Sequence, residues 1–311
     1  MTSAPRAVPI TIGLVALMLL AGCAPALRLS PTTATETLPR GAELADVPFF
    51  AQERYYCGPA SLAMVLAWSG LAVGPDDLVP EVYTPGREGT LRTDILAAAR
   101  RHGRLAVRVR TLPDLLAELA AGHPVLVFQN LALRWIPQWH FAVAIGYDLD
   151  AGALVLHSGT RARYVTPLRT FERTWARADR WAVVVLPPNR LPATADEPMV
   201  LQAASGLERA GRHAEAATAY GALLRRWPAS YAGLVGLGNA RYRLGDYAGA
   251  EDAFRRAIDL RPDDPAAWNN LAHALARQQR RDDAIAAAQE ALRRARGDAE
   301  AYRATLTEVS Q

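Results

Sequence analysis

The sequence has 311 residues, of which half are apolar, and this length favours two domains with a sizeable core. Its formal net charge of +4 is spread along the chain without a dense block of Lys and Arg, so nucleic-acid binding is not expected. The two cysteines, Cys23 and Cys57, could in principle form one disulfide, but the N-terminal pattern argues against it.

The N-terminus has the pattern of an export signal. Arg6 is the only charged side chain among residues 1–9, and the apolar run ITIGLVALMLLAGC over residues 10–23 is too short for a membrane-spanning helix. The run ends in Leu-Ala-Gly-Cys and resembles a bacterial lipoprotein signal, in which the peptide before the cysteine is removed and the cysteine is lipidated. The resemblance implies that Cys23 carries the lipid anchor, which leaves Cys57 as the single thiol. An ordinary secretory signal is the alternative.

Ala24, and not an aspartate, follows the cysteine predicted to be lipidated. In Gram-negative lipoproteins this resembles the pattern for sorting to the outer membrane. It implies a protein of the cell envelope that faces the periplasm and touches the membrane through its lipid only. Residues 24–44 are rich in Pro, Thr, Ala and Ser, so they suit a flexible tether.

Residues 45–188 are predicted to form a domain of the α+β class. Helical patterns come first and short runs rich in β-branched residues follow, so we expect a mostly antiparallel sheet. The expected helices cover residues 58–69, 91–102 and 113–122, and the expected strands cover residues 105–110, 124–130, 140–147, 153–157 and 181–187.

An internal repeat of 34 residues follows a proline-rich linker at residues 189–196. The units cover residues 197–230, 231–264 and 265–298, and residues 299–309 suit a capping helix. The period and the spacing of small and large residues resemble tetratricopeptide repeats, so residues 197–311 are expected to form an all-α solenoid. Such repeats bind peptide or protein partners in a concave groove. A structural stack that braces the first domain is the alternative.

Cys57 opens the first predicted helix of the α+β domain, within the stretch QERYYCGPASLAMVL at residues 52–66. A thiol is a weak nucleophile until it ionises, and a helix N-terminus favours the thiolate. A histidine brought alongside would complete a nucleophilic pair. Of the six histidines, His140 is the best candidate, because it opens an apolar strand and a strand end offers its side chains to a cleft. A small buried cysteine is the alternative for Cys57.

The order Gln52, Cys57-Gly-Pro-Ala and then WHFAVAIGYD at residues 139–148 resembles the papain-like peptidases that process bacteriocin leaders at double-glycine sites. The resemblance covers residues 45–188 and implies a papain-like cysteine peptidase domain. It implies that Cys57 is the nucleophile and that His140 transfers protons. Gln52 would donate a side-chain N–H to the oxyanion, beside the backbone N–H of Cys57. A solvated loop residue is the alternative for Gln52.

The third catalytic position departs from this family. Its members usually carry an aspartate on the strand after the histidine strand, but here that strand reads LVLHSG, with His157 and Ser158 at the position. Ser158 could orient His140 by a hydrogen bond. Asp148 and Asp150 lie nearby in the sequence, but we expect them in the hairpin turn.

The sequence thus predicts an exported, lipid-anchored cysteine peptidase that cleaves a peptide or isopeptide bond, with repeats that recruit the substrate or a protein partner. His and Cys residues do not cluster with metal-ligand spacing, so no metal or cofactor is expected. A catalytically inactive papain-like adaptor that holds a peptide is the alternative, and the weakened third position favours it. A transferase that uses the same thioester chemistry is a third reading.

Overall fold

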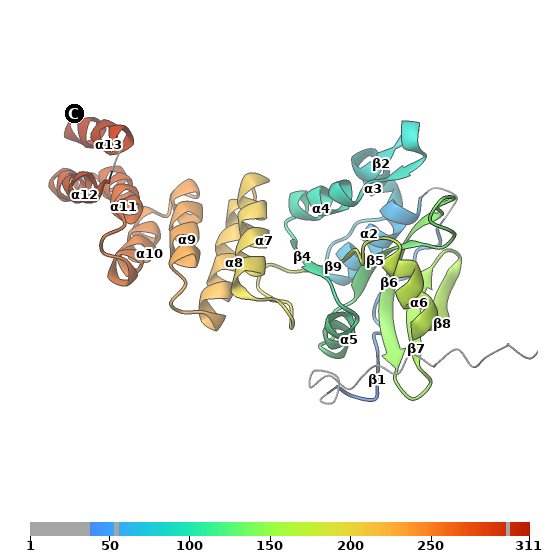
Figure 1. Cartoon of the computed structure of the whole chain (residues 1–311). Coiled ribbons are helices and arrows are strands. Elements are labelled where there is room, and N and C mark those ends of the chain that lie inside the picture. Colours follow the sequence, from blue (N-terminus) through green and yellow to red (C-terminus); the bar gives the residue numbers. More distant parts are fainter. Residues whose placement is uncertain (1–37, 53–55, 297–298) are drawn as a thin grey trace, which may run out of the picture.

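The computed structural model describes residues 38–52, 56–296 and 299–311. The predicted export signal, Cys23 and most of the predicted tether lie outside these residues. A domain built on a sheet comes first, and a stack of helices follows it (Figure 1). Within the described ranges, no helix has the length and apolar character needed to cross a membrane.

The sheet of the first domain is antiparallel at each strand pair, as the sequence predicts. Its strands follow the order β4-β9-β5-β6-β7-β8, and β1 pairs with the end of β6. A two-stranded sheet lies apart from it, where β2 and β3 are joined by the 3-10 helix η1. The bounds are β1 Gly41–Glu43, β2 Tyr83–Thr84, η1 Pro85–Arg87, β3 Gly89–Thr90, β4 Leu105–Val109, β5 Val125–Asn130, β6 Trp139–Asp148, β7 Ala153–Ser158, β8 Arg161–Pro167 and β9 Ala182–Leu186.

Helices cover both faces of this sheet, because its central strands are apolar on both sides. In β5, Leu126 and Phe128 face the cluster that contains α2, α3 and α4, whereas Val125 and Val127 face the cluster that contains α5 and α6. Successive side chains of a strand point to opposite faces, so one continuous apolar run serves both layers. The helices are α2 Cys57–Trp68, α3 Pro75–Val82, α4 Arg92–Arg101, α5 Leu112–Ala120 and α6 Leu168–Ala176.

Helix α2 is the central helix of the domain. Its residues 58–66 are all buried, since the segment is apolar on every side. The helix ends before Gly70, whose φ of +94° lies in the left-handed region that favours glycine. Cys57 is its first residue and is only half-buried. The helix therefore fixes the thiol at the edge of the core, where it can meet solvent or a ligand.

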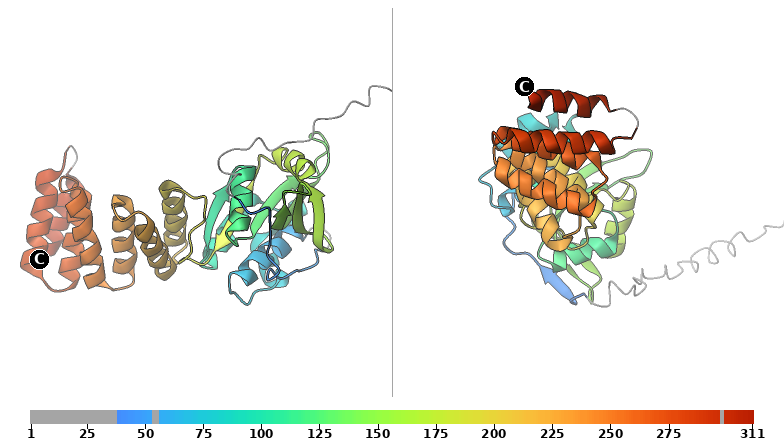
Figure 2. Two further views of the ribbon diagram at one scale, coloured as in Figure 1. Left: turned by 90° about the horizontal axis from the view of Figure 1, so that it is seen from below. Right: turned by 90° about the vertical axis from the view of Figure 1, so that its left-hand side faces the viewer.

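The second part is a row of paired helices that extends from the β4 edge of the sheet (Figures 1 and 2). Small residues allow close packing between them. A Cβ atom built on Gly236 would lie 2.4 Å from the Tyr220 ring, and one built on Gly238 would lie 2.4 Å from the Phe254 ring. The helices are α7 Glu197–Arg209, α8 His213–Arg226, α9 Tyr231–Arg243, α10 Tyr247–Leu260, α11 Pro265–Arg277, α12 Arg281–Arg294 and α13 Glu300–Ser310.

The segment between the two parts is fixed by a buried carboxylate. Glu118 of α5 accepts hydrogen bonds from the Thr194 N–H at 2.8 Å, from the Thr194 hydroxyl at 2.6 Å and from His123 Nδ1 at 2.7 Å. These donors hold the pKa of Glu118 below its usual value, against the opposing effect of burial. The linker predicted from its prolines is therefore anchored to the first domain.

Candidate active site

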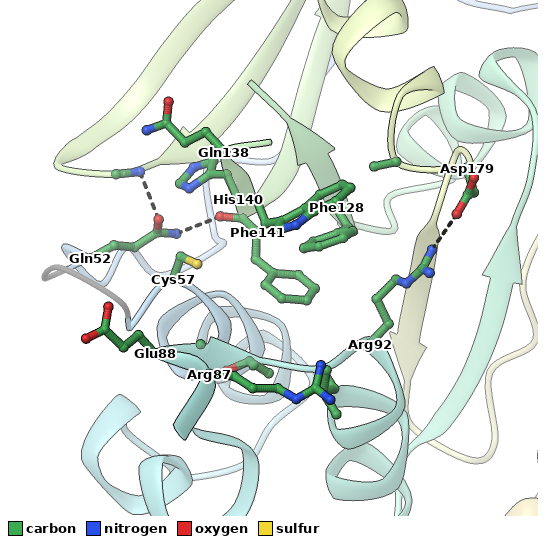
Figure 3. Close-up of a pocket in the computed structure, with 16 residues that line it drawn as sticks. Gln52, Cys57, Arg87, Glu88, Arg92, Phe128, Gln138, His140, Phe141 and Asp179 are labelled. Atoms are coloured by element: carbon green, nitrogen blue, oxygen red, sulfur yellow. Dashed lines mark hydrogen bonds and ion pairs between the residues drawn. The ribbon is translucent and has the colours of Figure 1, made fainter. Parts of the chain in front are cut away.

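A cleft of about 880 Å³ lies at the N-terminal end of α2 (Figure 3). Most of its residues come from the start of α2, the segment from η1 to α4, and the adjoining ends of β5 and β6, and the others lie in the loop before α2, the β7–β8 turn and the α6–β9 turn. Both members of the predicted nucleophilic pair are among them. The lining residues are Gln52, Cys57, Arg87, Glu88, Gly89, Thr90, Leu91, Arg92, Phe128, Gln138, Trp139, His140, Phe141, Gly159, Ala178 and Asp179.

Cys57 carries a free thiol and lines this cleft. Burial raises the pKa of the thiol, while hydrogen bonds with the backbone of Phe141, Gly58 and Cys57 itself act in the opposite direction. The helix start was expected to favour the thiolate, but the loss of hydration outweighs the backbone contribution. Cys57 therefore rests as a neutral thiol unless a base takes its proton.

His140 is the second residue of β6 and lines the same cleft (Figure 3). Its Nε2 lies 2.9 Å from Ser158 Oγ at the end of β7. Burial lowers the pKa of His140 to about 4, which favours the neutral imidazole. With Nε2 on the hydroxyl, Nδ1 is the ring nitrogen left to accept a proton. At neutral pH the ring is thus in the unprotonated form that a general base requires, and its low pKa makes it a weak base.

Ser158 therefore lies next to His140, at the position where the sequence predicts the orienting group. The other candidates, His157, Asp148 and Asp150, have other partners. Both ring nitrogens of His157 face backbone carbonyl oxygens, of Ala162 and, at 3.0 Å, of Val47. The Asp148 carboxylate accepts the backbone N–H of Asp150 at 2.9 Å in the β6–β7 turn, at the far end of β6 from His140. As expected, these aspartates belong to the hairpin turn.

Gln52 is buried and joins two strands beyond the point where they stop pairing. Strands β6 and β7 pair up to Val143 and His157. Past that point, Gln52 Nε2 donates to the Phe141 carbonyl at 3.3 Å, and Oε1 accepts the Gly159 N–H at 3.1 Å. The alternative of a solvated loop residue is therefore wrong.

The same contacts restrict the predicted oxyanion role of Gln52. Its Nε2 also lies 3.0 Å from the Ser61 hydroxyl, so both amide hydrogens have acceptors within reach. Donation to an oxyanion requires that Gln52 release one of these two contacts. In the resting structure, this amide supports the wall of the cleft.

Thr90 is a residue of the cleft that the sequence analysis did not single out. Its Oγ1 is buried without a hydrogen-bond partner. The side chain lies against Gly58, where an added Cβ would be 2.3 Å from Thr90 Oγ1. The buried hydroxyl lies beside the first turn of α2, where Cys57 is the first residue. No local pattern in the sequence marks this residue.

The described residues hold no group of three or more His, Cys, Asp or Glu side chains that could bind a metal ion. The cleft also has charged side chains, from Arg87, Glu88, Arg92 and Asp179. Arg92 pairs with Asp179 at 3.2 Å, and its guanidinium lies 5.7 Å from the centre of the Phe128 ring (Figure 3). The Cys57 thiol thus shares the cleft with the Gln52 amide and the His140 imidazole, which are groups that suit acyl transfer.

Comparison with protein families agrees with this geometry. Residues 44–183 match the C39-like peptidase family, and residues 201–265 and 235–300 match the tetratricopeptide repeat. The chain therefore has an N-terminal C39-like peptidase domain followed by tetratricopeptide repeats. No curated protein matches the chain.

Solved structures resemble each part separately. A C39-like peptidase from Bacillus anthracis is 20% identical, covers 48% of this chain and 98% of its own, and has a TM-score of 0.41. The tetratricopeptide domain of Sgt2 from Aspergillus fumigatus is 18% identical, covers 38% of this chain and 78% of its own, and has a TM-score of 0.36. The first such domain of human RPAP3 is 18% identical, covers 37% and 90%, and has a TM-score of 0.35.

Proposed function

We propose that this chain is an exported, lipid-anchored cysteine peptidase that cleaves a peptide bond. The observation that carries the proposal is that Cys57 and His140 line one cleft. His140 is also held by Ser158 through its Nε2 atom. The match of this domain to C39-like peptidases supports the same chemistry.

In the proposed reaction, His140 Nδ1 takes the thiol proton as Cys57 Sγ attacks the substrate carbonyl carbon. The backbone N–H of Cys57, at the start of α2, stabilises the oxyanion. The His140 imidazolium then protonates the leaving amine, and the C–N bond breaks to give a thioester. His140 next activates a water molecule, which hydrolyses the thioester and restores the free thiol.

Supporting residues have distinct parts in this scheme. Ser158 holds the Nε2 side of the ring, which leaves Nδ1 free to take the thiol proton in this scheme. Gln52 keeps the β6 edge in position through the Phe141 carbonyl and the Gly159 N–H. The repeats recruit a protein substrate or a partner, because such stacks present an extended concave surface.

A peptide-binding adaptor without catalysis is the second candidate. It is favoured by the hydroxyl at residue 158, since a hydroxyl stabilises an imidazolium less than a carboxylate does. The engaged amide of Gln52 favours the same reading. In an adaptor, the cleft would hold a segment of a partner and Cys57 would remain unmodified.

Turnover of an activated ester distinguishes the two. We expect p-nitrophenyl acetate to acylate Cys57 in a burst, followed by steady release of product. Cys57→Ala should abolish the burst, and His140→Ala should slow the steady phase at least tenfold, because general-base catalysis contributes about a hundredfold or more. An acyl-enzyme that persists unchanged in the wild type would favour the adaptor.

Lipid anchoring through Cys23 is a separate part of the proposal. Metabolic labelling with an alkyne fatty acid should tag the full chain and not Cys23→Ser. Fractionation should then find the wild type in the outer membrane, with its domains on the periplasmic side. Labelling that persists in Cys23→Ser would contradict this anchor.

A further inference from the structure

A cluster of exposed apolar side chains lies between β5 and β6. Leu133 is 52% exposed, Trp135 is 76% exposed and Ile136 is 67% exposed. Leu131 and Trp139 are exposed as well. Single exposed apolar residues are ordinary, but several within one short segment indicate an interaction site. We call residues 131–139 the apolar arm.

The apolar arm is held in a fixed shape by Asn130, which is 1% exposed. Its Oδ1 accepts the N–H groups of Ala132 at 3.1 Å and Gln138 at 3.0 Å, and its Nδ2 donates to the Leu133 carbonyl at 3.3 Å. The Leu131 N–H also donates to the Gln138 carbonyl at 2.9 Å. Asn130 thus fixes the shape of the arm before any ligand binds. Less conformational entropy is therefore lost on binding.

The arm continues into the candidate active site through Trp139. The Trp139 ring stacks on Phe128, with centroids 5.3 Å apart, and Phe128 packs on Phe141 at 4.5 Å. All three rings line the cleft that contains Cys57. Figure 3 shows Phe128 and Phe141 between Cys57 on one side and Arg92 on the other. We call these three rings the aromatic wall.

The arm lies at the opposite end of β6 from the point where the N-terminal part of the chain joins the sheet. Strand β6 runs from Trp139 to Asp148, and residues 41–43 pair with residues 146–148. In Figure 1, β1 lies at the bottom of the domain, whereas β2, next to the cleft, lies at the top. Because the arm is continuous through Trp139 with the cleft that contains Cys57, it favours a polypeptide bound in that cleft over a membrane.

We propose that the apolar arm and the aromatic wall bind the substrate as an extended polypeptide segment with bulky apolar side chains beside the scissile bond. The inference rests on the proposed function and adds its substrate class. A glycine-rich segment would leave the aromatic wall and the arm uncovered. Large apolar side chains cover both while the carbonyl reaches Cys57.

The test compares two chloromethyl ketone probes of equal length on the full chain, acetyl-Leu-Phe-Leu and acetyl-Gly-Gly-Gly. The rate at which each alkylates Cys57 is read by mass spectrometry. We expect the apolar probe to react at least tenfold faster. The double variant Trp135→Ser/Ile136→Ser should reduce this preference several-fold. The matched control Leu244→Ser/Leu260→Ser, at exposed apolar positions of the repeats, should leave it unchanged.

Equal rates for the two probes, or a faster glycine probe, would overturn the inference even if His140 activates Cys57. If neither probe labels Cys57, the peptidase function fails, and binding of the fluorescein-labelled amides of the same peptides still tests the cleft. Equal affinity for the two amides would then overturn the inference. Loss of binding to phosphatidylethanolamine–phosphatidylglycerol vesicles in the arm variant, with the probe preference intact, would make the arm a membrane contact and would also overturn it.

Discussion

His140 Nε2 lies 2.9 Å from Ser158 Oγ, so a neutral hydroxyl holds the imidazole that the proposed reaction uses as its base. A hydroxyl fixes the direction of the ring, but it adds no negative charge to stabilise the protonated form. Burial then dominates, and the pKa of His140 falls to about 4. The site is therefore arranged for a neutral resting pair, in which a proton moves only during attack.

Replacement of Ser158 tests this arrangement. Ser158→Asp should raise the pKa of His140 by about 1 unit or more, because an adjacent carboxylate favours the imidazolium. Ester turnover near pH 7 should rise with it, whereas Ser158→Ala should lower turnover about tenfold through loss of orientation. NMR titration of the His140 ring and the ester assay measure the two effects. A titration that is the same in all three proteins would contradict the assigned contact.

The depressed pKa of His140 also predicts how stability depends on pH. The unfolded histidine has a pKa near 6.5 and the folded one a pKa of about 4, so the unfolded state binds more protons between these values. This contribution to stability is present above about pH 6.5 and is lost as the pH falls towards 4, up to about 3 kcal/mol. His140→Gln should remove it.

Urea unfolding of the wild type and of His140→Gln at pH 7, 6, 5 and 4.5 measures this effect. Both proteins share the carboxylates and the other histidines, so the contributions of these groups to the pH dependence cancel in the difference. The stability difference between the two proteins should change in favour of the variant as the pH falls. A constant difference would contradict the buried, neutral state of His140.

Gln52 should be a structural residue as well as a residue of the cleft. Gln52→Ala leaves the Gly159 N–H and the Phe141 carbonyl without their partners, so the free energy of unfolding should fall by about 1–3 kcal/mol. Gln138→Ala is a matched control, since Gln138 lines the same cleft with an exposed side chain. Loss of ester turnover at unchanged stability would instead identify Gln52 as an oxyanion donor alone.

Two glycines in neighbouring repeat helices should respond to alanine in opposite ways. Gly238→Ala brings a methyl group against the Phe254 ring and should cost about 1–3 kcal/mol of stability. Gly221 lies inside α8 with open space around it, so Gly221→Ala should stabilise by about 0.5–1 kcal/mol. Urea unfolding of the full chain measures both. Equal effects would contradict the packing between these helices.

The strands and helices that carry a continuous apolar run could be predicted from the sequence. Strand β5 and helix α2 follow their predicted ranges within one residue at each end, because continuous burial leaves a continuous apolar run. Strand β8 was missed, since it has a single buried residue, Thr166, among polar ones. Helix α3 was missed as well, because it is short and contains Pro80, and so was helix α6, in which polar residues separate the buried Leu168, Phe171 and Trp175.

The candidate site was predictable where a local pattern marks a residue, as at the helix start of Cys57 and the strand start of His140. The partners of Gln52 were not, because Phe141 and Gly159 lie 89 and 107 residues away in the sequence. The effect of burial on the pKa of Cys57 and of His140 likewise depends on the packing around the cleft, which a single sequence does not reveal.

The most direct test of the nucleophilic pair is the rate of alkylation of Cys57 by iodoacetamide between pH 6 and pH 10. The wild type is compared with His140→Ala and with a control, His102→Ala, since His102 caps α4 outside the cleft. If His140 accepts the thiol proton, the wild type and the control should react near pH 7 at least tenfold faster than His140→Ala. His140→Ala should show a single titration above the ordinary thiol pKa of about 8.5. The same slow profile in all three proteins would show that Cys57 is a structural cysteine.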